Sequence, residues 1–147
     1  MAIKAIPKLI YTSPLSLHND VKEDLSAIKI ADPIAYAKIA ALIRQLRADC
    51  KLAEKLLDHG FGEKRTEELS VSKWFDVWKQ GKDLWRLKSW ELEDQGLKYR
   101  IIYLYLRNEA RFVVMAIVKR ENFDYDDHED NIRRRICASL QRTYDIH

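Results

Sequence analysis

The stretch LWRLKSWELEDQGLKYRIIYLYL, residues 84–106, carries the pattern that decides the fold. Branched and aromatic residues dominate residues 84–92 and 97–106, and the turn-forming sequence EDQG lies between them. A third segment of this kind, residues 111–119, follows the sequence RNEA. Apolar segments bounded by short polar turns are typical of β-strands joined by hairpins. The sequence therefore predicts a three-stranded antiparallel meander.

Helical patterns flank this meander on both sides. Upstream, residues 32–60 begin with Asp-Pro and end at a glycine, and apolar residues recur three and four positions apart. One long helix, or a helical hairpin with a break near Asp49, fits this pattern. Downstream, apolar residues recur every four positions from Ile132 to Tyr144. We therefore expect a closing helix within residues 127–144.

The order of these elements predicts an α+β fold. Helices that precede a meander bury their apolar faces against it in two layers. We expect N-terminal helices on one face of a twisted antiparallel sheet, a C-terminal helix, and an open basic concavity on the other face. A chain of 147 residues suits a single domain, residues 1–147. Within it we distinguish an N-terminal arm (residues 1–31), a helical part (residues 32–80) and the sheet with its closing helix (residues 82–147).

Composition limits the function only loosely. A net charge of +3 with 33% charged residues describes a well-solvated surface and does not by itself identify a nucleic-acid-binding protein. Cys50 and Cys137 lie far apart, without the spacing of a zinc site or a disulfide framework. No apolar run approaches the length of a membrane span. We expect a cytoplasmic protein with no metal, no cofactor and no membrane partner.

Three cations interrupt the apolar pattern of the first two predicted strands. Arg86 and Lys88 point to the same side, because alternate residues of a strand share a face. Arg100 lies in the next strand, on a face that otherwise carries isoleucine and leucine. A charge in such a position must reach a rim, find a partner or serve a site.

Four short motifs follow one another in this region: WRLK (85–88), YRIIY (99–103), IVKRE (117–121) and FDY (123–125). Together they resemble the strand motifs of the RelE/ParE superfamily, the toxins of type II toxin–antitoxin systems. The resemblance covers residues 82–140, and the N-terminal arm makes this chain an enlarged version. It implies a ribosome-dependent mRNA endoribonuclease that arrests translation. It also implies a cognate antitoxin protein and a toxin–antitoxin hetero-oligomer.

By this resemblance, Arg86 and Lys88 stand where such nucleases hold a basic pair, although the family prototype has lysine at the position of Arg86. Arg100 and Arg120 match an arginine of the second strand and one at the end of the last strand. RNA cleavage by its own 2′-hydroxyl requires a base, an acid and stabilisation of the phosphate charge. Arginine suits the last role because its planar fork binds phosphate and stays protonated. Lys88 is the expected base, because the neighbouring Arg86 would lower its pKa.

The remaining candidates follow the last strand. Tyr125 approximates a tyrosine of the family, although its spacing from Arg120 is one residue shorter. Asp124 stands where some relatives have a histidine. Either Asp124 or His128 is a candidate for the acid or base, and we count Asp124 and Tyr125 among the catalytic residues. Arg86, Lys119 and His128 are the candidates for RNA binding.

Structural roles compete with these assignments. Arg86 and Lys88 would also suit the solvated face of an edge strand, where charges discourage aggregation. Lys119 and Arg120 would suit ordinary strand-end positions. For Arg100, the candidate partners of a structural ion pair are Glu91, Glu93 and Asp124.

Two other functions fit the same fold. A non-enzymatic toxin similar to ParE would bind a protein such as DNA gyrase, and it would tolerate charge reversal at Arg86 or Arg100. An inactive protein that keeps the RelE fold only for binding would not arrest growth at all.

Overall fold

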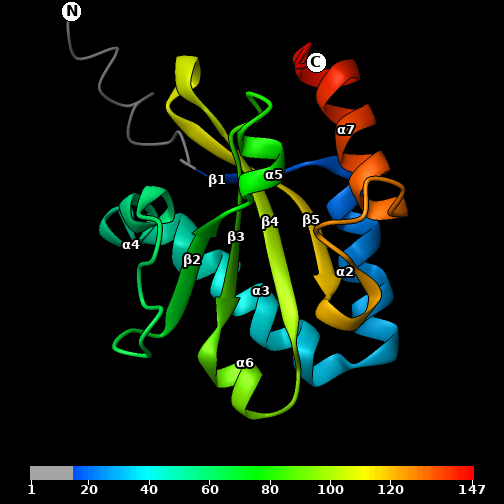
Figure 1. Ribbon diagram of the computed structural model, residues 1–147. Helices are drawn as coiled ribbons and strands as arrows, with labels where there is room; N and C mark the ends of the chain where they lie inside the picture. The colour runs from blue at the N-terminus through cyan, green and yellow to red at the C-terminus, as the bar shows by residue number, and fades with distance from the viewer. Residues whose placement is uncertain (1–14) are drawn as a thin grey trace, which may run out of the picture.

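The computed structural model describes residues 15–147 and has the expected α+β architecture (Figure 1). The strands are β1 (Leu15–Leu17), β2 (Leu69–Lys73), β3 (Leu84–Ser89), β4 (Tyr99–Leu106) and β5 (Arg111–Lys119). The α-helices are α2 (Asn19–Ala31), α3 (Pro33–Ala48), α4 (Cys50–Glu54), α5 (Phe75–Trp78), α6 (Trp90–Asp94) and α7 (Asn131–Tyr144). Three single 3₁₀ turns are η2 (Lys55–Leu57), η3 (Arg107–Glu109) and η4 (Arg120–Asn122).

The five strands form one sheet in the order β1-β5-β4-β3-β2. The predicted meander of β3, β4 and β5 is confirmed, and β2 extends it antiparallel to β3. β1 adds a short parallel pairing to β5, so the sheet is mixed rather than wholly antiparallel. The first predicted strand ends at Ser89 instead of residue 92. There the Ser89 hydroxyl accepts a hydrogen bond from the amide of Leu92 and caps α6.

The helix signals upstream of the sheet act as expected. Asp32 caps α3 by accepting a hydrogen bond from the amide of Ala35, and proline occupies the first turn. The break near Asp49 is confirmed: Asp49 ends α3, and its carboxylate caps the short helix α4. The closing helix begins at residue 131 rather than 127, because Asp130 caps it.

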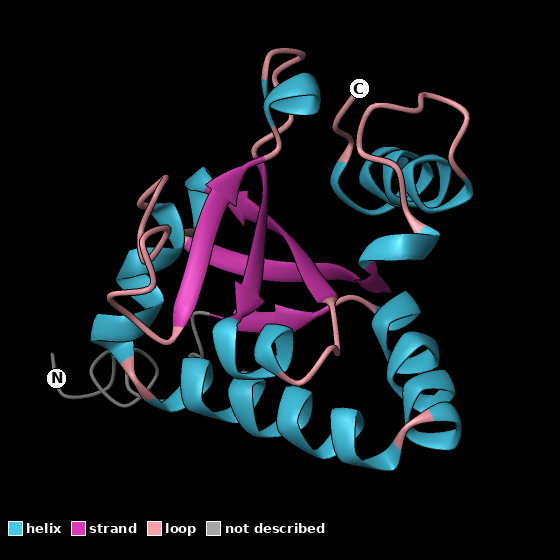
Figure 2. Cartoon of the chain, turned by 60° about the horizontal axis from the view of Figure 1, so that its bottom comes forward, coloured by secondary structure: helices cyan, strands magenta, loops and turns pink. Residues whose placement is uncertain are grey.

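One face of the sheet packs on α2 and α3, which form a layer below it (Figure 2). Ile39 and Leu46 of α3 meet Trp85 and Tyr103 of the sheet in this first core. Tyr103 is fully buried, and its hydroxyl donates to the carbonyl of Leu56 over 2.6 Å. Burial of aromatic and aliphatic side chains on this scale is the main stabilising contribution to such a domain.

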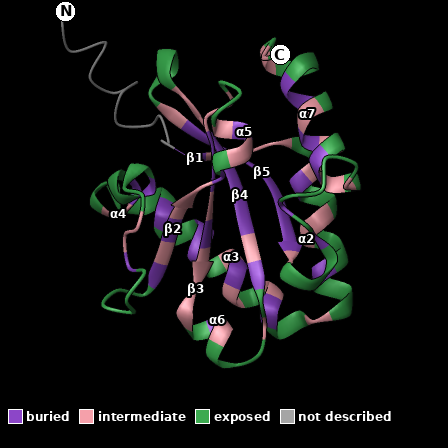
Figure 3. Cartoon of the chain, viewed as in Figure 1, coloured by how far each residue is buried: buried purple, intermediate pink, exposed green. Residues whose placement is uncertain are grey.

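The opposite face carries a second core that covers only part of it. Met115 and Leu104 of the sheet pack there against Leu140 of α7, Trp74 and Tyr125. Strands β4 and β5 are therefore buried along most of their length (Figure 3). The expected basic concavity can therefore occupy only part of this face, since α7 and residues 123–125 cover the rest.

Two of the predicted parts contain strands as well as helices. The N-terminal arm contributes β1 and α2 to the folded body, while its first fourteen residues lie outside the described part of the chain. The helical part contains the strand β2. Within residues 15–147, no helix has the length and apolar character needed to cross a membrane.

Candidate functional site

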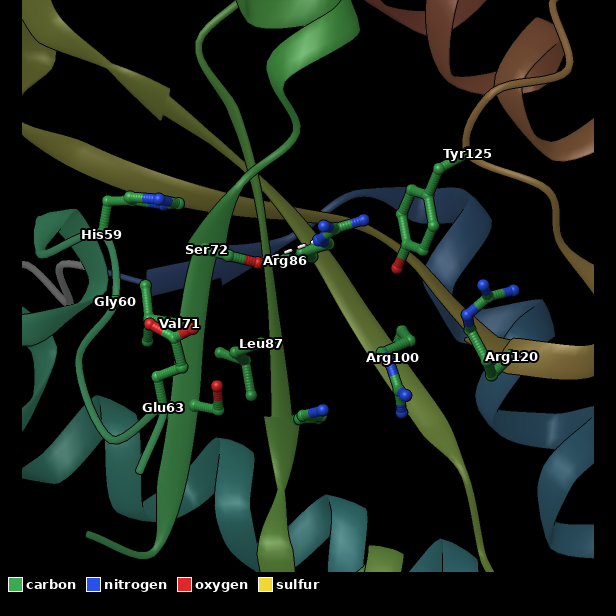
Figure 4. Close-up of a pocket in the computed structure, with 12 residues that line it drawn as sticks. His59, Gly60, Glu63, Val71, Ser72, Arg86, Leu87, Arg100, Arg120 and Tyr125 are labelled. Atoms are coloured by element: carbon green, nitrogen blue, oxygen red, sulfur yellow. Dashed lines mark hydrogen bonds between the residues drawn. The ribbon is translucent and has the colours of Figure 1, made fainter. Parts of the chain in front are cut away.

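A pocket of about 390 Å³ opens on the partly covered face of the sheet, next to the second core (Figure 4). We call it the basic pocket. Its lining residues are His59, Gly60, Glu63, Ser70, Val71, Ser72, Arg86, Leu87, Lys88, Arg100, Arg120 and Tyr125. Five of the eight predicted site residues therefore meet in one place, although they come from three separate segments of the chain.

Strand register builds the floor of the basic pocket. Lys88 lies opposite Ser70 on β2, and Arg86 lies opposite Ser72. On the other side of β3, Leu87 pairs with Ile101 of β4, so one further step of the register sets Lys88 beside Arg100. Because β3 lies between β2 and β4, the alternative explanation that its cations protect an edge strand is wrong.

Arg86 is held in place by two contacts. Its Nε donates a hydrogen bond of 2.8 Å to the Ser72 hydroxyl, and its guanidinium carbon lies 4.3 Å from the centre of the Tyr125 ring. Stacking of a guanidinium on an aromatic ring leaves its other N–H groups available. Arg86 can therefore bind an anion without giving up its support.

Arg100 has an acidic partner. Its Nη1 pairs with the carboxylate of Glu93 and also donates to the carbonyl of Tyr99 over 3.1 Å. Of the three candidate partners for a structural ion pair with Arg100, Glu93 is therefore the one that the structure shows. Arg100 still lines the basic pocket, so its guanidinium faces both the carboxylate and the open space.

Lys88 makes no ion pair with any carboxylate in the described part of the chain, and its Nζ lies 4.5 Å from the centre of the Trp90 ring. Burial, followed by the positive charge of Arg100, lowers the pKa of Lys88 below its ordinary value. The expected direction is confirmed, but the cause differs. Arg86 contributes less than burial and less than Arg100.

Tyr125 is buried at the wall of the basic pocket. No group of residues 15–147 meets its hydroxyl at hydrogen-bond geometry, although the Arg86 guanidinium lies near enough to act on its pKa. Figure 4 shows the hydroxyl directed into the space between Arg86, Arg100 and Arg120. Burial raises the pKa of Tyr125 above its ordinary value, although the charges of these three arginines oppose the rise. The phenol is therefore protonated at neutral pH and can donate a hydrogen bond to a ligand.

The backbone at Tyr125 is fixed from behind. Its carbonyl accepts hydrogen bonds from the indole of Trp74 (3.2 Å) and from Nη1 of the buried Arg133 (3.1 Å). Nη1 of Arg133 also contacts Oδ2 of Asp76 over 2.6 Å. Arg120 reaches the pocket from η4, directly after β5, and its Nη1 donates to the carbonyl of Phe123 over 3.2 Å.

Three predicted residues do not reach the basic pocket. Asp124 is exposed and accepts a hydrogen bond from the amide of Asp126 in its own turn. Nζ of Lys119 lies 3.8 Å from a carboxylate oxygen of Glu121. His128 is exposed, and its Nε2 lies 3.3 Å from Oδ2 of Asp76. Tyr125 turns inward while Asp124 turns outward, so Asp124 and His128 lie apart from the residues that line the basic pocket.

The prediction missed several lining residues. Ser70 and Ser72 alternate with the buried residues Leu69 and Val71 of β2, a period-two signal that the sequence LSVSK contains. His59 has no such signal. It follows η2 in a loop, and only the folded chain brings it to the pocket, where its Nδ1 accepts a hydrogen bond of 3.0 Å from the amide of Lys73.

The arrangement favours binding of an anion with several oxygens. Four cations line the basic pocket, and the carboxylates nearest to them are Glu63 on the wall and Glu93 behind Arg100. Guanidinium forks and a phenolic hydrogen are suitable donors for a phosphate group. Among residues 15–147, no group of three or more His, Cys, Asp and Glu side chains is arranged to hold a metal ion.

Comparisons with protein-family models, with curated proteins and with solved structures found no match to this chain.

Proposed function

We propose that this chain is a toxin of a toxin–antitoxin system, of the RelE/ParE type, and that it cleaves mRNA on the ribosome without a metal ion. The proposal rests chiefly on one observation: three arginines surround the buried hydroxyl of Tyr125, for which residues 15–147 provide no partner at hydrogen-bond geometry. An unsatisfied buried hydroxyl is costly, and a bound ligand would satisfy it. The ordered strand motifs supply the second line of support.

A phosphodiester group of RNA is the proposed ligand. Arg86 and Arg120 would hold its non-bridging oxygens, because neither guanidinium is paired with a carboxylate in the described residues. Arg100 would share its charge between Glu93 and the phosphate. Such prearranged donors stabilise the charge that develops on phosphorus oxygens in the transition state.

The chemistry requires two proton transfers. The 2′-hydroxyl oxygen attacks the adjacent phosphorus and passes its proton to the neutral amine of Lys88, whose lowered pKa favours that form. The bond from phosphorus to the 5′ oxygen breaks, and that oxygen takes a proton from the Tyr125 phenol. The products are a 2′,3′-cyclic phosphate and a 5′-hydroxyl end, and solvent returns the protons to their starting sites.

Dependence on the ribosome would follow from the shape of the site. The cationic side chains of the basic pocket would hold the phosphate, and the proposal assigns no lining residue to the ribose. Orientation of the reacting groups can supply much of a rate enhancement, and a ribosome-bound codon is already oriented. A cognate antitoxin protein and a cytoplasmic location belong to the same proposal.

Induced expression in a bacterium, with mapping of mRNA 5′ ends, tests this function. Wild type should arrest growth and produce cuts inside translated codons. Lys88→Ala and Tyr125→Phe should abolish the cuts although both variants fold. Arg134→Ala removes an exposed cation of α7 outside the basic pocket and serves as the matched control.

One observation favours a second function. The ion pair of Arg100 with Glu93 would also suit a basic pocket that is only structural, as expected of a toxin that binds a protein such as DNA gyrase. Growth arrest without mRNA cuts, unchanged by Lys88→Ala, would favour this alternative over the nuclease. Absence of arrest would favour an inactive binding protein.

A further inference from the structure

An exposed phenylalanine lies next to the basic pocket. Phe75 exposes 47% of its surface, and it is the only Phe, Tyr or Trp of residues 15–147 in the exposed class. It begins α5, which Figure 1 shows where β2 ends and β3 begins. Soluble proteins expose single apolar residues often, so exposure alone does not assign a role.

The chain directly before Phe75 is anchored by hydrogen bonds. The preceding residue, Trp74, is buried, and its amide donates to the carbonyl of Leu84 over 3.1 Å. The Trp74 indole donates to the carbonyl of Tyr125 on the far wall of the pocket. These contacts of Trp74 hold the start of α5 beside the proposed phosphate-binding residues, and an anchored backbone favours a preformed binding surface.

His59 connects Phe75 to the basic pocket. The two rings meet edge to face, with their centres 4.9 Å apart, and His59 itself lines the pocket. Figure 4 shows His59 at one end of the pocket and Tyr125 at the other. Because Nδ1 of His59 accepts the Lys73 amide hydrogen, the neutral ring carries its own hydrogen on Nε2. That N–H is a donor for a polar ligand atom.

Other aromatic rings near the pocket already have cations stacked over them. Trp90 has two cations over its ring, the guanidinium of Arg65 at 4.2 Å and the amine of Lys88 at 4.5 Å. Lys73 lies 4.1 Å from the centre of the Trp78 ring. Among the described residues, no cation lies over Phe75, so its ring is the one available for stacking.

We propose that Phe75 and His59 form a subsite for a nucleobase of single-stranded RNA whose phosphate occupies the basic pocket. This inference rests on the proposed function and names where its substrate would bind. The base would stack on the Phe75 ring, and the Nε2 hydrogen of His59 would face its polar edge or the adjoining phosphate. Any base can stack on an aromatic ring. We therefore expect this subsite to raise the affinity for RNA without selecting a particular base.

Binding to the purified chain tests the subsite directly. The probes are a labelled 2′-O-methyl RNA of about eight nucleotides, a length typical of single-strand sites, and the same oligomer without bases. Neither can be cut by its own 2′-hydroxyl, and both carry the same phosphates. Affinities are measured at low salt by fluorescence anisotropy for wild type, Phe75→Ala and Phe75→Trp. Ile30→Ala removes another exposed apolar side chain, on α2, and is the control.

Phe75→Ala should weaken binding of the base-bearing oligomer roughly 5- to 100-fold and leave binding of the abasic oligomer unchanged. Phe75→Trp should restore the affinity. If Phe75→Ala changes neither affinity while Arg86→Ala weakens both, the subsite is wrong and the phosphate-binding pocket stands. If wild type binds neither oligomer, the subsite and RNA binding by the free chain both fail, and the mapping of mRNA ends decides the proposed function separately.

Discussion

Arg100 and Glu93 form an ion pair at the wall of the basic pocket, where they expose only 12% and 11% of their side chains. The Glu93 carboxylate holds the Arg100 guanidinium in place, but it also neutralises part of the positive charge of Arg100. Burial of both groups makes their interaction strong, and it makes the loss of one partner costly. Arg100 therefore has a structural role that is separable by experiment from its proposed role with RNA.

Replacement of Glu93 should separate the two roles of Arg100. Glu93→Gln removes the negative charge, so we expect the free energy of unfolding to fall by about 2–4 kcal/mol. RNA affinity should rise in the same variant, because the full charge of Arg100 then faces the phosphate. Urea unfolding and anisotropy measure the two effects. A fall in both stability and affinity would contradict a phosphate contact for Arg100.

The pH dependence of cleavage should report Lys88. Its pKa is lowered by burial and by Arg100, and only the neutral amine can accept a proton. The rate on programmed ribosomes should therefore rise with pH until it passes the folded-state pKa of Lys88. Lys88→Arg keeps a permanent charge and should lose both the activity and this rise. An unchanged pH profile in Lys88→Arg would exclude Lys88 as the base.

The same lowered pKa of Lys88 has a consequence for stability. Between the pKa values of the folded and unfolded states, the unfolded chain binds more protons at Lys88. The contribution of Lys88 to the free energy of unfolding should therefore increase as pH rises through that window. Lys88→Met should be relatively more stable than wild type at neutral pH, and the difference should shrink in alkaline buffer. Thermal unfolding at several pH values measures this.

Tyr125→Phe isolates the hydroxyl that has no partner. The ring contacts with Trp74 and Phe123 remain, and no described hydrogen bond is lost. We expect the free energy of unfolding to stay within about 1 kcal/mol of wild type or to rise. Cleavage should fall by about 10²- to 10⁴-fold, the usual contribution of a positioned acid. Calorimetry and single-turnover cleavage measure the two; a large loss of stability would indicate a structural hydroxyl instead.

Arg133 should act on the pocket from outside it. The residue is buried, and it joins the carboxylate of Asp76 to the carbonyl of Tyr125. Arg133→Met should remove the Arg133 hydrogen bond from both acceptors, leaving the Tyr125 carbonyl with the Trp74 indole alone, and lower the free energy of unfolding by about 3–5 kcal/mol. Hydrogen exchange should quicken in residues 123–130 more than in α3. If hydrogen exchange quickens equally along the whole chain, Arg133 stabilises the fold as a whole and has no specific role in positioning Tyr125.

The pair of Arg133 and Asp76 also predicts an acid-sensitive contact. The hydrogen bond from Arg133 lowers the pKa of Asp76, so the contribution of this pair is present near neutral pH and is lost as pH falls through the folded-state pKa. Asp76→Asn should reduce the slope of stability against pH in the acidic range. His128→Ala, which removes the other side chain near Asp76, is the comparison variant.

The local pattern of the chain was sufficient for the three-stranded meander and for the main helices on either side of it. The strand patterns of residues 84–106 and 111–119, the proline after Asp32 and the four-residue period after Asp130 predicted three strands and two helices. These signals are local, because they depend on the periods of strand and helix and on side chains that bond to their own backbone. The shared face of Arg86 and Lys88 follows from the same period of two.

Tertiary structure decided which of the charged residues meet. Lys88 lies beside Arg100 through the register of β3 and β4, and Arg120 and Tyr125 reach the pocket through the turn after β5. The inward direction of Tyr125, with Asp124 directed outward, depends on Trp74 and Arg133 from distant parts of the chain. His59 enters the pocket from a loop. Contacts between residues so far apart in sequence depend on packing, and no local period encodes them.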